Sequence, residues 1–484
     1  MRRRDLLQAA VSLALAPVIG RAENKPCPPA EFDVVGAGSV TTSCEPGVAP
    51  RWFLDLPEKS WTAVAGGTGE RIVDVRPDVT FGFGATVQTM TTAWTGGCVD
   101  QERGELVFAA NGGHTDYAGN EVYACQVRSD RPRWYRLNDP TPAAMVKAAL
   151  TSSQSTSNSV AGQGLNPDRF AAMFADGRMR SVHGWHSCQF ADGKIWYPHQ
   201  SSPTGGGNSA PHAWVFNRSA AGMPTAAGQT PLRWEDDAGP WTWLGATHSG
   251  STALDSRGES YGTAPCSAYD PVSRLIWTVE GNTCRLWSSL NTATREVRGS
   301  AIYPFSDNTG SDGMWGAVVY DPKDRWRFLV VPARHRKGLH ILNLKATNPY
   351  VDSAWSVVNV SDSTVLTDTT GCGAVFHAPS KSILLGNPIG NYGSLGGDVL
   401  AIRVPTNADG GYSGGTWNVS RVSPAASSAN PASGIRGIAP SCEQNGAWSK
   451  FNLIEDMGNG QGALVVCLAV DKPTYVYKLP MQGV

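Results

Sequence analysis

The sequence predicts an all-β protein built as a single β-propeller. Three observations carry this prediction. The 484 residues include 54 Gly, 32 Pro and 17 Trp, a composition typical of many short strands joined by tight turns. A strand, turn, strand, loop, strand unit recurs along the chain, and a lone strand near the N-terminus has no such unit around it.

Each repeated unit has a polar turn, often Asp-Pro or Asp-Gly, between its first two strands, and a longer loop before the third. Four antiparallel strands recurring at this spacing are typical of propeller blades. The six units span residues 94–125, 186–216, 266–287, 316–342, 373–402 and 448–477. Fourth strands are expected at residues 134–135, 234–235, 355–356 and 417–418.

The two ends of the chain are predicted to meet. The last unit lacks a fourth strand, and the lone strand around Trp61-Thr62-Ala63-Val64 can supply it. That pairing closes the ring and removes an exposed sheet edge. We count six blades, and residues 138–182 leave a seventh open, although they also have the composition of a Ser/Thr/Asn-rich insertion. A β-sandwich is the alternative fold, but it does not explain the repeat.

The N-terminus has the pattern of an export signal. A basic head, a short apolar stretch and small residues fill positions 1–22, and the apolar part is too short to span a membrane. The adjacent arginines resemble a twin-arginine signal, which implies a bacterial protein that is periplasmic or secreted. We expect an N-terminal extension over residues 23–50, with a local bridge between Cys27 and Cys44, and the propeller over residues 51–484.

Composition and charge narrow the partners. The net charge is −1 and only 17% of residues are charged. The sequence contains no basic stripe that would indicate nucleic-acid binding and no further apolar stretch that could cross a membrane. We expect a monomer whose partner is a polysaccharide or glycan. The 10 cysteines include no Cys-x-x-Cys pair. Cys98, Cys188 and Cys266 share one first-strand position, which indicates either packing or bridges within a blade to Cys125 and Cys284.

Two segments carry a resemblance to a known family. Residues 111–123, Asn-Gly-Gly-His-Thr-Asp-Tyr-Ala-Gly-Asn-Glu-Val-Tyr, resemble the first-blade motif of bacterial kelch-like, galactose-oxidase-type propellers. The last blade, with Trp448, Lys450 and Phe451 ahead of Val476 and Tyr477, is similar to the way those proteins end. The resemblance covers most of residues 50–484 and implies the fold. Such propellers include oxidases, lyases, hydrolases and plain binders, so it does not identify the activity.

Strand direction predicts which face carries function. If each first strand runs upward, the loops between second and third strands gather with the starts of the first strands on one face, which we call the 2–3 loop face. Eight of the 9 histidines approach this face or lie just inside it, and only His377 clearly does not. Loops on a rigid fold carry function. The expected substrate contacts there are Asp116, Asn120, Trp185, His199, His212, Asp312, Trp315, His335 and Tyr392.

The favoured reaction on this face is β-elimination of a uronic-acid polysaccharide. Arg334 suits the substrate carboxylate, because a guanidinium meets it through two hydrogen bonds. His114 or His186 suits the base that removes the proton at C5. Tyr117 or Tyr197 could protonate the leaving oxygen. The assignment rests on analogy with propeller lyases that use His, Tyr and Arg, and the sequence leaves open whether the protein is an enzyme.

Glycan binding without catalysis is the main alternative. Trp94, Trp185, Trp315 and Trp448 could be flat platforms for sugar rings, although Trp in propellers more often packs between blades. A glycosidase using Asp116, Glu280 or Asp312 is a further option.

A metal site is the third hypothesis. No cofactor is required by the favoured reaction, but His183, His186, His199 and His212 are neighbours in one blade and have the right chemistry for a divalent metal. His183 and His186 would face opposite sides of a strand, so both can ligate only from a loop. Copper radical chemistry would need a Tyr–Cys crosslink near two histidines, and the shared Cys position does not indicate one.

Overall fold

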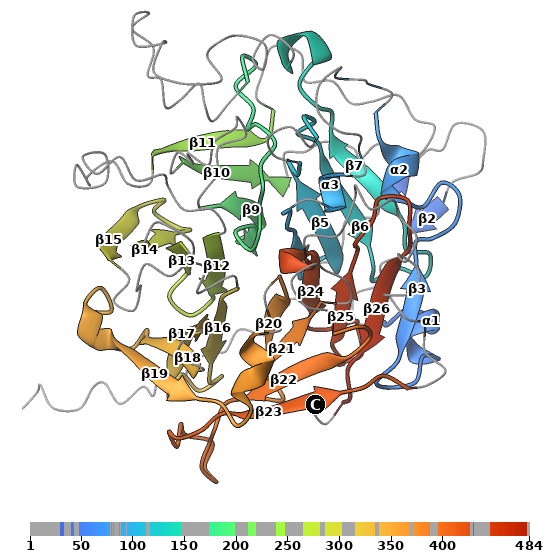
Figure 1. Cartoon of the computed structure of the whole chain (residues 1–484). Coiled ribbons are helices and arrows are strands. Elements are labelled where there is room, and N and C mark those ends of the chain that lie inside the picture. Colours follow the sequence, from blue (N-terminus) through green and yellow to red (C-terminus); the bar gives the residue numbers. More distant parts are fainter. Residues whose placement is uncertain are drawn as a thin grey trace, which may run out of the picture.

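Six four-stranded antiparallel sheets form the computed structural model of this chain, arranged around an axis as the blades of a propeller (Figure 1). The prediction of a six-bladed propeller is confirmed. The structure describes residues 30–32, 40–42, 48–77, 79, 81, 87, 89–92, 94–112, 117–146, 174–198, 212–218, 239–246, 265–280, 286–302, 315–333, 338–367, 369, 371–387, 395–425, 429 and 446–481.

The blades are numbered along the chain, and the first strand of each is the innermost. Blade 1 holds β4 (Cys98–Asp100), β5 (Glu105–Ala109), β6 (Val122–Gln126) and β7 (Trp134–Asn138), and blade 2 holds β8 (Gln189–Ala191), β9 (Lys194–Tyr197), β10 (His212–Asn217) and β11 (Trp241–Ala246). Blade 3 holds β12 (Pro265–Asp270), β13 (Leu275–Glu280), β14 (Leu286–Asn291) and β15 (Val297–Ile302), and blade 4 holds β16 (Ala317–Tyr320), β17 (Arg327–Ala333), β18 (Gly338–Asn343) and β19 (Trp355–Asn359). Blade 5 holds β20 (Gly373–His377), β21 (Ser382–Gly386), β22 (Val399–Arg403) and β23 (Asn418–Val422), and blade 6 holds β24 (Phe451–Ile454), β25 (Ala463–Val466), β26 (Thr474–Lys478) and β3 (Trp61–Val64).

The ring is closed by the N-terminal strand, as the sequence predicts. Strand β3 pairs antiparallel with β26, in a register that sets Trp61 opposite Tyr477 and Val64 opposite Thr474. In Figure 1 the blue β3 accordingly lies beside the red β26. The Trp61 indole Nε1 donates a hydrogen bond to Gly397 O at 2.8 Å, so the closing strand is also held to blade 5.

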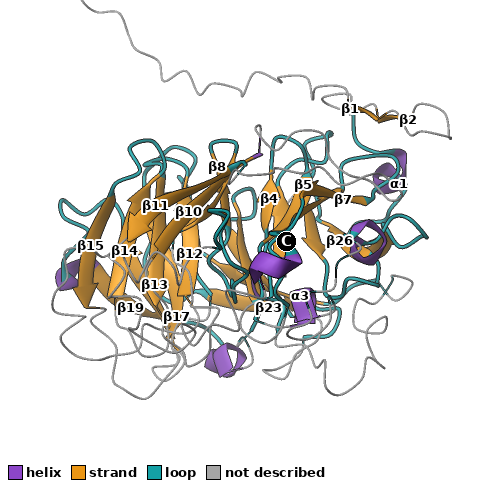
Figure 2. Ribbon diagram, turned by 90° about the horizontal axis from the view of Figure 1, so that it is seen from above, coloured by secondary structure: helices purple, strands orange, loops and turns teal. Residues whose placement is uncertain are grey.

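Aspartate at the end of the first strand shapes several of the turns between first and second strands. In blade 3 the Asp270 carboxylate accepts hydrogen bonds from the Val272 N–H at 3.0 Å and the Ser273 hydroxyl at 2.5 Å. In blade 4 the Asp321 carboxylate accepts from the Arg325 N–H at 3.2 Å. Asp side chains favour such turns because they bond the backbone two to four residues later. Figure 2 shows the blades edge-on, with short turns along one rim.

The secondary structure outside the blades is short. The helices are α1 (Arg51–Leu54), α2 (Ile72–Val75), α3 (Thr89–Thr92) and the 3₁₀ turns η4 (Asp352–Ala354), η5 (Ser363–Thr367) and η7 (Trp448–Lys450). Strands β1 (Ala30–Phe32) and β2 (Val40–Thr42) pair with each other. No helix among the described residues is long and apolar enough to span a membrane.

Several sequence expectations differ from the structure or fall outside it. The fourth strand of blade 2 is β11, whereas the expected segment 234–235 lies outside the described residues. Most of the insertion at 138–182, the export signal at 1–22 and the Cys27 and Cys44 pair also lie outside them. The fourth strand of blade 3, β15, had no predicted counterpart.

The hydrophobic core lies between the blades. Apolar clusters combine residues of neighbouring sheets, such as blades 1 and 2 or blades 4 and 5. Tryptophan dominates the largest fully buried side chains of the described residues. Trp315 and Trp448 are completely buried, and Trp185 is 5% exposed. In the structure these three indoles pack within the protein.

The described cysteines are packing residues. Cys98 and Cys125 are free buried thiols, so they form no bridge within blade 1. They lie on strands one and three, which adjacent-strand spacing separates by roughly 9–10 Å, too far for a disulfide. The Cys98 thiol instead contacts Cys188 of blade 2, and burial followed by that contact raises the pKa of Cys98 well above its usual range. Cys284 lies outside the described residues.

Removing the Trp61 side chain from the closing strand β3 should destabilise the whole ring. Trp61→Ala removes a buried indole that packs 5.1 Å from the Tyr477 ring, and loss of such a side chain costs about 3–5 kcal/mol. Denaturant unfolding followed by tryptophan fluorescence would measure the loss. Val357→Ala on the exposed face of β19 is the control, with an expected change below about 0.5 kcal/mol. Equal losses in the two variants would contradict a special role for the closing strand.

Candidate functional site

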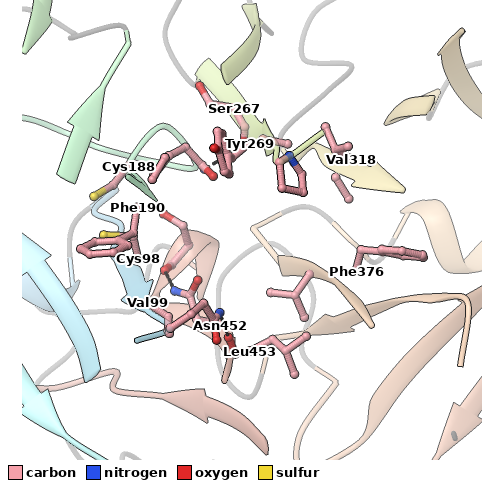
Figure 3. A pocket seen from close by; sticks show the side chains of 18 of the residues that line it. Cys98, Val99, Cys188, Phe190, Ser267, Tyr269, Val318, Phe376, Asn452 and Leu453 are labelled. Atoms are coloured by element: carbon pink, nitrogen blue, oxygen red, sulfur yellow. Dashed lines mark hydrogen bonds between the residues drawn. The ribbon is translucent and has the colours of Figure 1, made fainter. Parts of the chain in front are cut away.

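A cavity of about 460 Å³ lies at the centre of the ring, and we call it the axial pit. Its walls come from the first strands of all six blades, so it exists only when the ring is closed. Figure 3 shows side chains converging on it from successive blades. The labelled wall residues are Cys98, Val99, Cys188, Phe190, Ser267, Tyr269, Val318, Phe376, Asn452 and Leu453.

The pit has a mouth and a floor. The exposed residues of its lining lie in or beside the turns between first and second strands, as Gln101, Glu102 and Asp192 do. The lining residues at the starts of the first strands, such as His186 and Ser449, are buried. The pit therefore opens on the face opposite the 2–3 loop face, and we call that the turn face.

Backbone hydrogen bonds from three blades hold the floor together. The Ser449 hydroxyl donates to Trp185 O at 2.9 Å. The Gly97 N–H donates to both the carbonyl and the hydroxyl of Ser449, at 3.0 and 3.1 Å. A Cβ at Gly96 would lie 2.2 Å from Ser449 Oγ and 2.3 Å from Trp185 O, so only glycine fits this approach. Blades 1, 2 and 6 are thus locked to one another at the axis.

His186 links further blades across the floor. Its Nδ1 lies 3.3 Å from Ser267 O of blade 3, so this nitrogen carries the proton and donates. Its Nε2 accepts from the Ala374 N–H of blade 5 at 3.4 Å. Burial lowers the pKa of His186 to about 4, so the ring is neutral. Both nitrogens are therefore engaged, and His186 is placed as a structural link between blades.

The mouth is lined by partly exposed aromatic side chains at one repeated position. Phe190, Tyr269, Tyr320 and Phe376 come from blades 2, 3, 4 and 5, and each lies just before the turn that follows its first strand. The rings of Tyr320 and Phe376 are 5.5 Å apart. Sequence reasoning assigned these residues no role. The signal was an aromatic residue before the Asp-Pro turn, seen as Tyr-Asp-Pro at 269–271 and at 320–322.

Polar groups accompany the aromatic rings at the mouth. Gln101 anchors the turn of blade 1 on blade 6, because its Nε2 donates to Leu453 O at 2.7 Å and its Oε1 accepts from the Glu455 N–H at 3.0 Å. Gln189 donates to Ser267 O at 2.9 Å. Burial raises the pKa of Glu455, although the residue as a whole is exposed. Burial, and after it the negative charges of Glu455 and Asp270, raises the pKa of Tyr320 to about 12.

Three of the residues predicted from sequence lie buried away from the pit mouth. The Tyr117 hydroxyl donates to Glu121 Oε1 at 2.5 Å, and the Tyr197 hydroxyl donates to Ala109 O at 2.5 Å. The Asn120 side-chain amide donates to Met179 O at 2.8 Å and to the Thr141 hydroxyl at 3.0 Å. The Tyr197 bond joins β9 of blade 2 to β5 of blade 1, and the bonds of Tyr117 and Asn120 hold residues outside the strands to one another.

Two tryptophans beneath the floor have unusual backbone conformations. Trp185 has φ 38° and Trp448 has φ 45°, a left-handed region that bulky residues rarely adopt. They pack against each other and against Trp94. The His183 ring lies 5.2 Å from Trp94 and 5.3 Å from Trp185. His183 therefore lies in an aromatic cluster. It belongs to the same irregular segment as His186, outside the strands.

The remaining predicted residues are not described by the structure. His114, Asp116, His199, Asp312, Arg334, His335 and Tyr392 lie outside the described residues, and so does the side chain of His212. The same holds for the side chain of Glu280. Within the described part of the chain, no group of three or more His, Cys, Asp or Glu residues could hold a metal ion.

The chain was compared with known proteins. No family model matches it, and no curated protein matches it. Its structural neighbours include the major allergen Mala s 1 of Malassezia sympodialis, at 8% identity over 81% of this chain and 94% of that one, with a TM-score of 0.40. They also include a Bacteroides thetaiotaomicron protein of unknown function, at 14% identity over 87% of this chain and 75% of that one, with a TM-score of 0.32. The likeness concerns the fold alone.

The buried neutral state of His186 predicts a pH dependence of stability. Its pKa is lowered to about 4 in the folded protein, so below the unfolded value of about 6.5 only the unfolded chain takes up a proton. Stability should therefore fall by about 3 kcal/mol between pH 6.5 and 4 through this residue. Urea unfolding at several pH values should show a shallower loss in His186→Gln, because glutamine does not titrate. An identical pH profile in both proteins would contradict the assignment.

Proposed function

We propose that this β-propeller is a carbohydrate-binding protein that takes a sugar into the axial pit from the turn face. The observation that carries the proposal is the set of partly exposed aromatic side chains, Phe190, Tyr269, Tyr320 and Phe376, at one repeated position around the mouth. Such rings can pack on the apolar faces of sugars. Ligand sites commonly combine aromatic walls with a few placed polar groups, in cavities of about 300–1,000 Å³.

The polar groups of the pit support the same proposal. Gln189 and Asn452 bring side-chain amides to the lining, and Glu102 and Glu455 bring carboxylates. Amides offer donors and acceptors to sugar hydroxyl groups, and ionised carboxylates offer acceptors. The kelch-like resemblance in sequence and the expected export to the periplasm or beyond fit an encounter with extracellular glycans.

Loss of one aromatic ring from the mouth should weaken sugar binding. Phe376→Leu keeps an apolar side chain but removes the flat face, so we expect at least about a tenfold weaker affinity. Phe376→Trp should retain binding. Titration calorimetry with oligosaccharides selected from a glycan panel would measure both, with Trp52→Ala on α1 as an aromatic control away from the pit. Equal affinity in Phe376→Leu and the parent protein would remove the pit as the binding site.

Elimination of a uronic-acid polysaccharide is the second candidate, and it belongs to the 2–3 loop face. The hydrogen bonds of the described candidates limit which residues could act as base or acid. The hydroxyls of Tyr117 and Tyr197 and both nitrogens of His186 are already hydrogen-bonded within the protein. The base and the carboxylate partner would then be His114 and Arg334. This candidate is supported by the position that the sequence predicts for both residues, on the 2–3 loop face.

Elimination has a direct optical test. Incubation with a panel of uronic-acid polysaccharides, with and without chelator, should raise ultraviolet absorbance if an unsaturated product forms. His114→Ala and Arg334→Ala should then each abolish the rise while the far-ultraviolet circular dichroism stays unchanged. A flat trace over the whole panel would reject elimination. A rise that survives both substitutions would reject these two residues.

A further inference from the structure

The mouth of the axial pit carries negative charge without a matching cation in its described lining. Glu102 follows β4 and Glu455 follows β24, and neither carboxylate forms an ion pair with a described residue. A third acid, Asp192, is paired with Arg274 at 2.8 Å. The described lining contains no Lys or Arg, and its histidine, His186, is neutral and buried at the floor.

The two unpaired acids belong to one part of the rim. Gln101 hydrogen-bonds the backbone of blade 6 at Leu453 and Glu455, which brings the turn carrying Glu102 against the end of β24. The Glu455 charge also acts on the Tyr320 hydroxyl of blade 4. Since Tyr320 contacts Phe376 of blade 5, acids and aromatic rings surround the same opening. Figure 3 shows Phe376 on the side of the pit opposite Phe190 and Cys98.

The acids and aromatic rings at the mouth would discriminate between sugars by their charge. A uronate would bring a third like charge to Glu102 and Glu455, which disfavours its binding. A protonated amine can form charge-assisted hydrogen bonds with the carboxylates and cation–π contacts with the aromatic faces. A neutral sugar gains only the stacking and the neutral hydrogen bonds.

The closed floor of the pit limits how a glycan can enter it. His186 is 4% exposed and Ser449 is 2% exposed, and both are held by hydrogen bonds between blades. A glycan can therefore reach into the pit with one end but cannot pass through it. The cavity volume of about 460 Å³ suits a short terminal segment.

We propose that the axial pit binds the terminal amine-bearing sugar of a glycan, in its ammonium form, with Glu102 and Glu455 as the groups that select it. This inference rests on the proposed carbohydrate binding. The expected ligand is a glycan whose terminal residue is a 2-amino-2-deoxyhexose. Glycans that end in a uronic acid should not bind in this pit.

The test compares matched oligosaccharides by titration calorimetry at about pH 6, below the usual pKa of an amine. The probes are a short glucosamine oligomer, its fully N-acetylated counterpart and a galacturonic-acid oligomer of equal length. We expect the glucosamine oligomer to bind about tenfold more tightly than the acetylated one and the galacturonic-acid oligomer to give no heat of binding. Added salt should reduce the preference, because it screens exposed charges.

Variants of the rim acids identify the selecting groups. Glu455→Gln and Glu102→Gln should each lower the ratio of the affinity for the glucosamine oligomer to the affinity for the acetylated oligomer, because glutamine removes the charge and keeps a hydrogen-bonding oxygen. Asp352→Asn, an exposed acid in η4 away from the mouth, is the matched control and should change nothing.

The outcomes separate the two proposals. Equal binding of the amine and acetylated oligomers, or an unchanged preference in both glutamine variants, would overturn the amine inference and leave carbohydrate binding in place. Tighter binding of the galacturonic-acid oligomer would also overturn it. Failure of every oligosaccharide to bind would overturn the proposed function and the inference with it.

Discussion

The pairing of β3 with β26 is the contact on which the rest of the structure depends. It joins segments some four hundred positions apart in the chain, and it completes a blade that would otherwise have three strands and an open edge. The neighbouring helix α1 reinforces it, because Lys478 Nζ donates to the carbonyls of Phe53 and Leu54 at 2.9 and 3.0 Å. Because the axial pit is bounded by all six first strands, its shape follows from this closure.

At the axis, hydrogen bonds between blades replace the hydrophobic contacts that hold the periphery. Ser449, His186 and the backbone around Gly97 connect blades 1, 2, 3, 5 and 6 through groups that are fully buried. Buried polar groups are stable only when they are satisfied, so this floor constrains the positions of the first strands closely. The same groups are thereby withdrawn from chemistry: a histidine with both nitrogens bonded and a tyrosine bonded to a carbonyl serve the architecture.

The two faces of the propeller then suit different roles. The turn face presents a preformed pit whose aromatic rings come from equivalent positions in successive blades and whose acids stand on the rim. Repetition of the fold explains this arrangement, since one position in each repeat is brought to the same height around the axis. The sequence predicts that the 2–3 loop face carries His114 and Arg334, the residues proposed for elimination. Binding at one face and reaction at the other are independent proposals, and their ligands differ in charge.

The sequence by itself determined the class of fold, the repeat and the closing strand, because strand alternation and Asp-containing turns are local signals. It favoured six blades but left a seventh open, which the structure excludes within the described residues. It placed the first strands and most fourth strands, and it missed β11 and β15. It could not determine the site. The aromatic residues before the turns look like ordinary strand residues until the ring closes, and Tyr197 and His186 look catalytic until their hydrogen bonds to other blades are seen. Only the tertiary structure brings six distant first strands to one axis, and that convergence decides which side chains face the pit and which are buried as links.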